Sequence, residues 1–309
     1  MHYLITGGAG FIGSNIADIL VEHGHKVRIL DDFSSGKEEN LAAIINDIEV
    51  IRGDIRDHDT VRKAVTGVDY VFHEAALASV QKSVEDPVEA NDINLNGTLC
   101  VLENSRRAGV KKLVMASSAA IYGDSPVLPK HEKMLPEPLS PYAVHKLTGE
   151  HYLKIYWELY KFPTVALRYF NVFGPKQDPA SDYAAVIPCF ISRLVAGKAP
   201  IVYGDGEQTR DFIYIDNCVE ANLLAMSNDD MVGEVYNAAL GDQITLNQLL
   251  EELGKITGSD VKPVYEPARS GDIRYSYASI DKIKKVGFKP KVGFAEGLKK
   301  TVEFFASKK

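Results

Sequence analysis

A serine, a tyrosine and a lysine carry the clearest chemistry in this 309-residue sequence. Tyr142 and Lys146 are four residues apart, a spacing that places both side chains on one face of a helix. A tyrosine has a pKa of about 10, so a base that works near pH 7 needs a shift of roughly 3 units. The Lys146 ammonium acts in that direction because it favours the phenolate. Ser118 follows an apolar run and can hydrogen-bond a reacting oxygen, with Ser117 as the competing hydroxyl.

A glycine-rich segment near the start of the chain predicts a dinucleotide site. The segment GGAGFIG, residues 7–13, follows an apolar strand pattern and opens a helical one, which is the context that gives such glycines meaning. Gly7 permits a tight turn, Gly10 lets a pyrophosphate approach the backbone, and Gly13 lets the helix pack on the strand. The pyrophosphate would lie at the helix N-terminus, where free N–H groups and the helix dipole favour an anion.

Acidic and small residues at later strand ends extend this site. Asp31 lies about 20 residues past the glycines, where a carboxylate bonds the ribose hydroxyls and repels a 2′-phosphate, so NAD is favoured over NADP. An oxidised nicotinamide would add a second cation near the tyrosine. Asp54 is a candidate for the adenine amine or, alternatively, for the cap of the next helix. The predicted cofactor-binding set is Gly7, Gly10, Phe11, Ile12, Gly13, Asp31, Asp54, Ile55, Ala75, Ala76, Asn94, Ser117, Tyr142 and Lys146.

Alternating strand and helix patterns in the first half predict the scaffold. Predicted strands cover residues 2–6, 26–31, 48–52, 70–74, 112–117 and 163–169, and predicted helices cover 11–22, 57–65, 87–108 and 142–161. Continuous apolar strands that alternate with helices indicate a parallel sheet covered on both faces, in a doubly wound (Rossmann) α/β fold. The catalytic serine then ends a strand at the carboxyl edge of the sheet, where ligands bind in such folds.

The second half is less regular and predicts a smaller lobe. Short helices are predicted over 187–196, 217–226 and 246–257, between loops rich in Gly, Pro and Asp. We expect residues 1–170 to form the NAD-binding domain, with additional strand and helix segments from the second half. Residues 171–309 are expected to form mainly an α/β lobe that binds the substrate.

Six motifs in order resemble extended short-chain dehydrogenase/reductases of the nucleotide-sugar epimerase group. They are TGGAGFIG (6–13), ASSAAIYGD (116–124), SPYAVHK (140–146), LRYFNVFGP (167–175), GDGEQTRDFIYIDN (204–217) and RSGDIRYSYA (269–278). The stretches DYAAVIP (182–188) and LNQL (246–249) look like the UDP-N-acetylglucosamine 4-epimerase subgroup. The resemblance implies an isomerase with tightly bound NAD. The resemblance also implies the mechanism. Tyr142 removes the proton of the carbon 4 hydroxyl, hydride passes to NAD, and the 4-keto sugar turns over and receives the hydride on its other face.

The resemblance also implies which residues bind a UDP-sugar. Asn171 should contact the diphosphate side, Arg210 and Arg269 should clamp the phosphates, and Asp272 should bind the uridine ribose. Arg210 paired with Asp211 on the surface, and Asp272 as a plain turn residue, are the alternatives. The predicted substrate-binding set is Ser118, Asn171, Arg210, Arg269, Asp272 and Ser276.

Two positions separate the reactions within the group. Related sugar 4,6-dehydratases have an Asp-Glu pair directly after the catalytic hydroxyl residue, where this chain has Ala119 and Ala120, so dehydration is disfavoured. Ser276 matches the position that walls the pocket beside carbon 2 of the sugar, and a serine leaves room for an N-acetyl group unless a neighbour such as Tyr275 or Tyr277 closes the space. We therefore expect UDP-GlcNAc and UDP-GalNAc as substrates. The alternatives are the UDP-glucose/UDP-galactose pair or both pairs, then a uronate epimerase or decarboxylase, and then a non-catalytic NAD-binding module.

Composition narrows the remaining possibilities. A net charge of −7 argues against nucleic-acid and anionic-membrane partners, and no apolar run approaches the length of a bilayer span. Three widely spaced cysteines suggest neither a disulfide framework nor a metal site. The N-terminus opens straight into a strand pattern without a signal peptide, so we expect a cytoplasmic protein. The resemblance implies a homodimer built from the helices near 99–108 and 142–161. The apolar stripe Leu153, Tyr156, Trp157 and Tyr160 fits that interface, but such a stripe is more often plain core.

Overall fold

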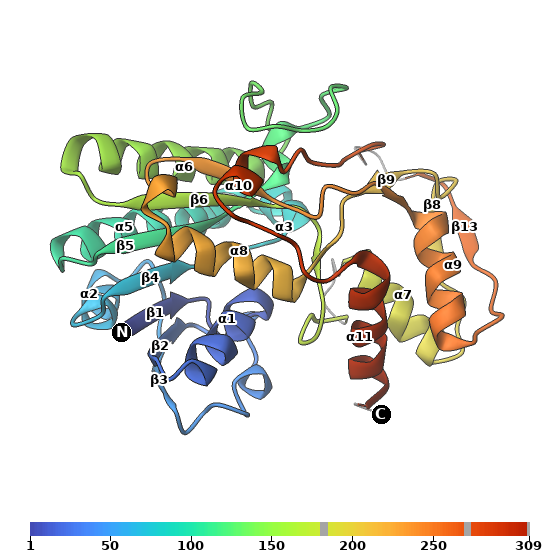
Figure 1. Cartoon of the computed structure of the whole chain (residues 1–309), viewed down its shortest axis with the longest axis horizontal. Coiled ribbons are helices and arrows are strands. Elements are labelled where there is room, and N and C mark those ends of the chain that lie inside the picture. The colour runs from blue at the N-terminus through green and yellow to red at the C-terminus, as the bar shows by residue number, and fades with distance from the viewer. Residues whose placement is uncertain (180–184, 269–272, 308–309) are drawn as a thin grey trace.

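A parallel sheet of seven strands, counted over the described residues, forms the centre of the computed structural model (Figure 1). The structure describes residues 1–179, 185–268 and 273–307. The strands are β1 (His2–Thr6), β2 (Lys26–Asp31), β3 (Ile48–Arg52), β4 (Tyr70–His73), β5 (Lys112–Ser118), β6 (Thr164–Tyr169) and β11 (Val235–Ala238). Their order is β11-β6-β5-β4-β1-β2-β3, and every neighbouring pair is parallel. The doubly wound α/β fold expected from the sequence is confirmed.

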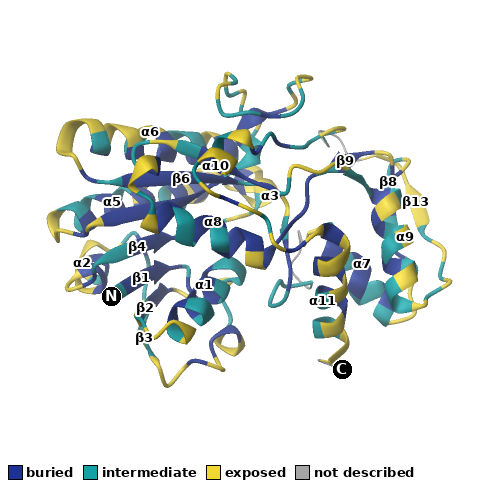
Figure 2. Cartoon of the chain, viewed as in Figure 1, coloured by how far each residue is buried: buried dark blue, intermediate teal, exposed yellow. Residues whose placement is uncertain are grey.

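The strands are apolar because helices cover both faces of the sheet. Leu4 belongs to one buried cluster, whereas its neighbours Tyr3 and Ile5 belong to the other, as the alternation of side chains along a strand requires. On one face lie α1 (Phe11–Glu22) and α8 (Ile215–Ser227), and on the other lie α2 (His58–Val65), α5 (Thr98–Arg107) and α6 (Pro141–Tyr160). Most of these strands are correspondingly dark in the burial colouring of Figure 2, except the partly buried edge strand β3, while the outer sides of the helices are exposed.

The order of the strands places a crevice at the carboxyl end of β1. The chain runs outward from β1 to β2 and β3 on one side, and then to β4, β5 and β6 on the other. Crossover connections therefore leave to opposite faces at this point, and ligands bind in the crevice that results. The loops after β1, β2, β4, β5 and β6 all open at this edge, so residues far apart in the sequence meet there.

The smaller lobe contains short strand pairs and three helices in its described part (right-hand side of Figure 1). The strand pairs are β7 (Val172–Phe173) with β10 (Ile213–Tyr214), β8 (Ile201–Tyr203) with β13 (Val264–Glu266), and β9 (Thr209–Arg210) with β12 (Ile244–Thr245). The helices are α7 (Val186–Val195), α9 (Leu246–Thr257) and α11 (Phe294–Ser307). The ends of α9 are explained locally, because Thr245 and Gln248 form a capping box and Gly258 follows in the left-handed region.

The remaining elements show where the predicted boundaries differ from the structure. They are α3 (Val80–Glu85), α4 (Pro87–Asn91), α10 (Asp281–Lys285), the 3₁₀ turns η1 (Glu38–Asn40), η3 (Ala119–Tyr122) and η4 (Asp229–Met231), and the π-helical η2 (Asp92–Gly97). The single helix predicted over 87–108 was wrong in detail, because η2 separates α4 from α5. The six predicted strands lie within one residue of β1 to β6. In the described part of the chain, no helix has the length and apolar character that a bilayer crossing needs.

Candidate active site

The glycine-rich turn between β1 and α1 leaves the start of the helix open. Gly7 has a φ of +69°, and a Cβ there would lie 2.6 Å from the backbone nitrogen of Ala75. A Cβ at Gly13 would lie 2.4 Å from the carbonyl oxygen of Gly7, so the helix packs directly on the turn. Gly10 is the N-cap of α1 without a side-chain cap, and a Cβ there would have one near neighbour, the Gly7 oxygen at 3.1 Å. A side chain at Gly10 would thus fill space in front of the first N–H groups, a geometry that fits a dinucleotide pyrophosphate.

Asp31 connects this turn to the end of β2. Its carboxylate accepts hydrogen bonds from the backbone N–H of Ala9 at 2.9 Å and of Phe33 at 2.8 Å. Burial raises the pKa of Asp31, against the lowering by these two N–H donors. Each carboxylate oxygen accepts about two hydrogen bonds, so the carboxylate retains acceptor capacity for ribose hydroxyls. Phe11 and Ile12, both partly exposed, form the first turn of α1 beside it.

Asp54 and Ile55 follow β3 and play different parts. Arg56 donates to Asp54 at 2.6 Å, and this hydrogen bond lowers the pKa of the carboxyl group. The alternative role of Asp54 as a helix cap was wrong, since Asp57 caps α2 by accepting from the N–H of Asp59. Ile55 is buried and supports the π-helical turn. The contact between Asp54 and adenine stays a prediction.

The end of β4 is held in place by Asn94. Ala75 and Ala76 are partly exposed at this end, as small residues beside a cofactor should be. Asn94 lies on η2, and its amide accepts from Leu77 N at 2.7 Å and donates to Leu77 O at 3.1 Å. Both ends of this amide are therefore used to fix the loop that follows the two alanines. Asn94 can therefore contribute to cofactor binding by fixing the conformation of the loop that follows Ala75 and Ala76.

The structure brings the three residues of the predicted catalytic set together. Ser118 is the last residue of β5, and Tyr142 and Lys146 lie on α6. The Ser118 hydroxyl interacts with the Tyr142 phenol in the direction that lowers the pKa of Tyr142. The Lys146 ammonium donates to the carbonyl oxygen of Ala116 at 2.8 Å and lies 5.8 Å from the centre of the Tyr142 ring. Ser140 caps α6 and a proline follows it, which explains why the helix begins just before Tyr142.

Burial dominates the electrostatics of this set. It raises the pKa of Tyr142, an effect that outweighs the hydrogen bond from Ser118, and the nearby carboxyl of Glu74 acts in the same direction as burial. It also lowers the pKa of Lys146 to about 8. In the chain by itself the lysine therefore does not bring Tyr142 to the range of a neutral-pH base, contrary to the direction expected from the sequence. A further positive charge in the crevice would move Tyr142 toward the phenolate.

The two neighbouring serines have different partners. Ser117 is buried and donates its hydroxyl to Glu150, which lies one turn after Lys146 on α6. Glu150 in turn accepts two hydrogen bonds from Arg168 of β6. Because the Ser117 hydroxyl is used in this way, Ser118 is the candidate for a substrate contact. Sequence reasoning did not find Glu150 and Arg168, although the spacing of Tyr142, Lys146 and Glu150 on one helix face was a usable signal.

Two of the predicted substrate-binding residues meet on the smaller lobe. Arg210 of β9 donates from Nη1 to the carbonyl oxygens of Thr209 at 2.8 Å and Ile273 at 2.7 Å. Ser276 donates its backbone N–H to Thr209 O at 3.2 Å, so it lies on the segment paired with β9. The alternative, a surface ion pair between Arg210 and Asp211, does not fit the structure. Asp211 is fully buried and accepts hydrogen bonds from three backbone N–H groups.

Other predicted residues lie apart from this pair or beyond the described structure. Asn171 follows β6 and donates to the carbonyl oxygen of Asp211 at 3.0 Å. Arg269 and Asp272 lie outside the described residues, as does the start of the DYAAVIP stretch. Ala119 and Ala120 occupy η3 directly after Ser118, and the N–H of Ala120 donates to the Ser118 hydroxyl at 3.1 Å.

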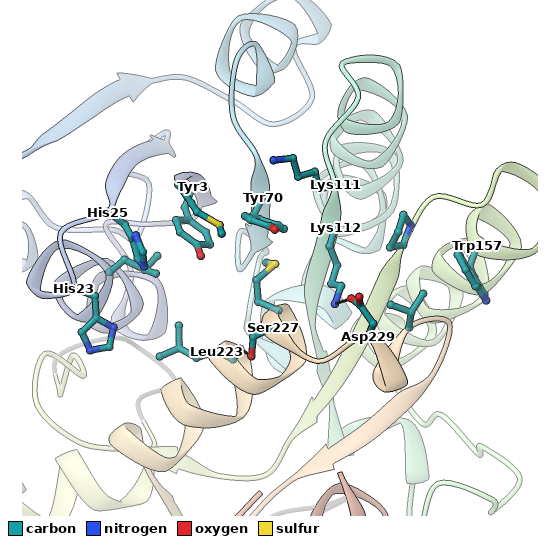
Figure 3. A pocket seen from close by; sticks show the side chains of 15 residues that line it. Tyr3, His23, His25, Tyr70, Lys111, Lys112, Trp157, Leu223, Ser227 and Asp229 are labelled. Carbon is teal, nitrogen blue, oxygen red and sulfur yellow. Dashed lines mark hydrogen bonds and ion pairs between the residues drawn. The ribbon is translucent and has the colours of Figure 1, made fainter. Parts of the chain in front are cut away.

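A hollow at the opposite end of the sheet is separate from this site (Figure 3). Its volume is about 840 Å³, and its lining includes Tyr3, Tyr70 and Lys112, which lie where β1, β4 and β5 begin. Ser118 ends the strand that Lys112 starts, so the two are about 20 Å apart at the usual rise per strand residue. The hollow holds none of the catalytic set. Over the described residues there is also no cluster of three His, Cys, Asp or Glu side chains suited to a metal ion.

Comparison with known proteins identifies related chains over the full length. The family model described as the NAD dependent epimerase/dehydratase family matches residues 3–239. The UDP-N-acetylglucosamine 4-epimerase from Methanobrevibacter ruminantium M1, solved in complex with UDP-N-acetylmuramic acid, has a TM-score of 0.96 and 44% identity, covering 100% of this chain and 99% of that chain. The UDP-glucose 4-epimerase from Thermotoga maritima, solved with UDP-glucose, has a TM-score of 0.95 and 42% identity with the same coverage. The UDP-glucose 4-epimerase from Thermus thermophilus, solved in complex with NAD, has a TM-score of 0.90 and 39% identity, covering 99% of each chain.

Proposed function

The chain belongs to the NAD-dependent epimerase/dehydratase family and is an NAD-dependent UDP-sugar 4-epimerase, and we propose that it interconverts UDP-GlcNAc and UDP-GalNAc. The observation that carries the substrate proposal is the small, partly exposed Ser276 on the segment paired with β9, next to Arg210. An arginine suits a diphosphate because its planar guanidinium donates two parallel hydrogen bonds. A serine near it leaves room for the N-acetyl group at carbon 2 of the sugar.

We assign acid–base chemistry to the set at the end of β5. In this assignment Ser118 hydrogen-bonds the oxygen on carbon 4 and lies close enough to Tyr142 to lower its pKa. Tyr142 takes the hydroxyl proton in one half of the reaction and returns it in the other. Lys146, held by the Ala116 carbonyl, keeps a positive charge on the same helix face. The chemistry that NAD supplies when bound is reversible acceptance of a hydride, together with the positive charge that Tyr142 requires.

The residues after Ser118 support epimerisation over dehydration. The family includes dehydratases, and elimination of water needs a further acid and base beside the sugar. Ala119 and Ala120 at these places have no ionisable group. Epimerisation needs only that the keto sugar turns over in the site, with a firm grip on the nucleotide. We assign that grip to Asn171, Arg210, Arg269 and Asp272, and cofactor binding to residues 1–170 with α8 and β11.

The test is epimerisation of four substrates by one enzyme preparation: UDP-GlcNAc, UDP-GalNAc, UDP-glucose and UDP-galactose. We expect conversion of the N-acetyl pair, and we expect Ser276→Tyr to abolish it while turnover of the plain hexoses survives or rises. Ser276→Ala is the matched control, because it keeps the space and should retain the ratio of the two activities. Turnover of plain hexoses alone by the unmodified enzyme would refute the N-acetyl assignment and leave the 4-epimerase activity in place.

We also propose that the enzyme is a homodimer that pairs through α5 and α6. The exposed side of α6 carries Ile155, Leu159 and Tyr160, at 43%, 68% and 52% exposure. Leu153 and Tyr156 from the predicted stripe are buried within the chain instead and belong to its core. Light scattering should give twice the chain mass, and Leu159→Arg should give a single-chain mass. A single-chain mass for the unmodified protein would refute the dimer.

A further inference from the structure

Glu74 is an ionisable residue at the carboxyl end of strand β4. It follows β4 and directly precedes the cofactor-lining alanines. Its Oε1 lies 2.9 Å from the hydroxyl oxygen of Tyr169, which ends β6. The same hydroxyl lies 2.9 Å from Oδ1 of Asn222, a fully buried residue of α8. The three side chains form a line from the crevice into the core, and the reaction described above does not use them.

The charge of Glu74 follows from the number of hydrogens that the side chains of Glu74, Tyr169 and Asn222 can place in the two contacts between them. A phenol has one hydrogen to donate, yet the Tyr169 oxygen has an oxygen atom on each side. Asn222 cannot supply a second hydrogen, because its Nδ2 donates to the carbonyl oxygen of Cys218 at 2.9 Å and so leaves Oδ1 facing Tyr169. An ionised Glu74 would leave one of the two 2.9 Å contacts without a hydrogen. A protonated Glu74 satisfies both, with Glu74 donating to Tyr169 and Tyr169 donating to Asn222.

The surroundings of Glu74 are consistent with a protonated carboxyl group. Burial raises the pKa of Glu74 to about 7, against the lowering effects of the Tyr169 hydrogen bond and the Lys146 charge. Tyr169 of β6 and Lys146 of α6 lower the pKa of Glu74. Glu74 in turn raises the pKa of Tyr142 of α6 and of Cys218 of α8. Burial raises the pKa values of Tyr169 and Cys218 well above their ordinary values, so both stay neutral.

Glu74 therefore matters most for Tyr142, because both groups ionise to anions at the same end of the sheet and Glu74 raises the pKa of Tyr142. A negative charge on Glu74 raises the pKa of Tyr142, whereas a neutral carboxyl group removes that repulsion. The effect needs no contact with the sugar. Glu74 thus changes the pKa of the proposed base, Tyr142, through its charge.

We propose that Glu74 is a positioning residue whose protonated form is favoured by the Tyr169–Asn222 relay, and that loss of its proton opposes formation of the Tyr142 phenolate. The inference rests on the proposed role of Tyr142 as the base only for its effect on turnover. Its structural content, the proton on Glu74 and the coupling to Tyr142, is independent of the substrate.

The first test is infrared difference spectroscopy of the protonated carboxyl group. The difference between the unmodified protein and Glu74→Gln at pH 6 should contain the C=O band of a carboxylic acid, and this band should fade as the pH rises past about 7. Asn222→Leu removes the final acceptor, which frees Tyr169 to donate to an ionised Glu74, so the band should fade at lower pH. Absence of the band at pH 6, or a fading point unchanged in Asn222→Leu, would overturn the proposal.

The second test is an ultraviolet titration of Tyr142 without substrate. The tyrosinate signal of each protein is taken as its difference from the same protein carrying Tyr142→Phe. Glu74→Gln should lower the pH at which Tyr142 ionises by about one unit, the order expected from removing one nearby negative charge. Glu49→Gln is the matched control, since it removes a carboxylate from β3, and it should produce no shift. An equal ionisation pH in the unmodified protein and Glu74→Gln would show that Glu74 has a structural role only.

Turnover provides the last readout. Because the unmodified enzyme gains a negative charge beside its base as Glu74 ionises, kcat should fall at alkaline pH relative to Glu74→Gln, with KM little changed. A KM change without a change in the pH profile of kcat would contradict the coupling. Since both spectroscopic tests use no substrate, they separate failure of this proposal from failure of the proposed function.

Discussion

Arg168 donates two hydrogen bonds to Glu150, from Nε to Oε1 at 2.9 Å and from Nη2 to Oε2 at 2.7 Å. The two side chains are 5% and 4% exposed. Removal of one partner leaves an unpaired buried charge, which costs about 3–5 kcal/mol. We expect Arg168→Met to lower the free energy of unfolding by about that amount in urea denaturation, and Arg168→Met with Glu150→Met to recover part of the loss. A double variant no more stable than the single one would contradict this explanation.

The neighbouring serines should separate catalysis from stability. Ser118→Ala removes the hydroxyl that lowers the pKa of Tyr142 and should lower kcat about 10²-fold or more with little change in stability. Ser117→Ala removes the hydrogen bond to buried Glu150 and should lower the free energy of unfolding by about 1–3 kcal/mol, with kcat within a few-fold of the unmodified enzyme. Steady-state kinetics and urea denaturation of both variants check the pair. The assignment of Ser118 fails if Ser117→Ala loses more kcat than Ser118→Ala.

Gly7→Ala should destabilise the chain more than Gly24→Ala does. Both glycines have positive φ, +69° and +73°, so both variants carry backbone strain of about 1 kcal/mol. A Cβ at Gly24 meets nothing within 4 Å, whereas a Cβ at Gly7 would lie 2.6 Å from Ala75 N. We expect both variants to lower the Tm, measured by calorimetry, and only Gly7→Ala to lower the affinity for NAD as well. Equal losses in both variants would mean that strain, and not the contact with Ala75, decides the effect.

Asp31→Asn should weaken NAD binding and reduce the preference for NAD over NADP. The substitution removes the negative charge that repels a 2′-phosphate and leaves one acceptor oxygen where Ala9 and Phe33 now bond two. We expect about a tenfold loss of NAD affinity in titrations of cofactor-stripped protein, equivalent to about 1.4 kcal/mol. Asp32→Asn is the control, because Asp32 is exposed and bonds Ser34. If Asp32→Asn changes the NAD/NADP ratio as much as Asp31→Asn, the choice of Asp31 is wrong.

His73 should make the protein lose stability in acid. Its Nδ1 lies 2.7 Å from the Thr6 hydroxyl and its Nε2 lies 2.9 Å from the Thr98 hydroxyl, which itself donates to Asn94 O. Nε2 therefore carries the hydrogen and Nδ1 accepts, so the neutral ring satisfies both contacts. Burial lowers the pKa of His73 to about 3.

The sign of the effect follows from proton uptake. An unfolded histidine takes up its proton near pH 6.5 and the folded one only near pH 3, so the stability that His73 contributes is present above pH 6.5 and is lost as the pH falls toward 3. Between pH 6 and pH 4, the free energy of unfolding should change less per pH unit in His73→Leu than in the unmodified protein. The difference should be about 1.4 kcal/mol per pH unit, because the variant lacks the one proton that the unfolded histidine takes up. The same slope in both proteins would show that His73 takes up its proton in the folded state.

Strands β1, β4, β5 and β6 were predictable because they are buried on both faces and read as apolar runs, whereas the edge strand β3 is only partly buried. Two parts of the fold were not predictable in the same way. The pattern over 87–108 is continuous, and the shift to π-helical bonding at η2 occurs where Gly97 packs on Ile55, a tertiary contact that periodicity does not contain. Strand β11 is short and includes Asn237, whose amide bonds Lys130 O and Ser279 O, so its polarity makes sense only in the folded chain.

The proximity of Ser118, Tyr142 and Lys146 was predictable because these residues have fixed spacing and strand-end positions. The groups that support it were not. Glu74, Glu150 and Arg168 look like ordinary charged residues in the sequence, and their roles depend on which side chains the fold buries beside them. The direction of the Tyr142 pKa was missed for the same reason, since burial is a property of the folded site.

The late arrival of β11 has a consequence for how the enzyme is made. A growing polypeptide that has reached Tyr169 already contains β1 to β6, but β6 remains an open edge until Val235–Ala238 have been synthesised. The sheet face that α8 covers also stays bare until about the same point. An unpaired edge strand beside exposed apolar surface is a template for association with other chains. A fragment cut after residue 170 should for this reason aggregate, and the two lobes are not units that one cleavage can separate.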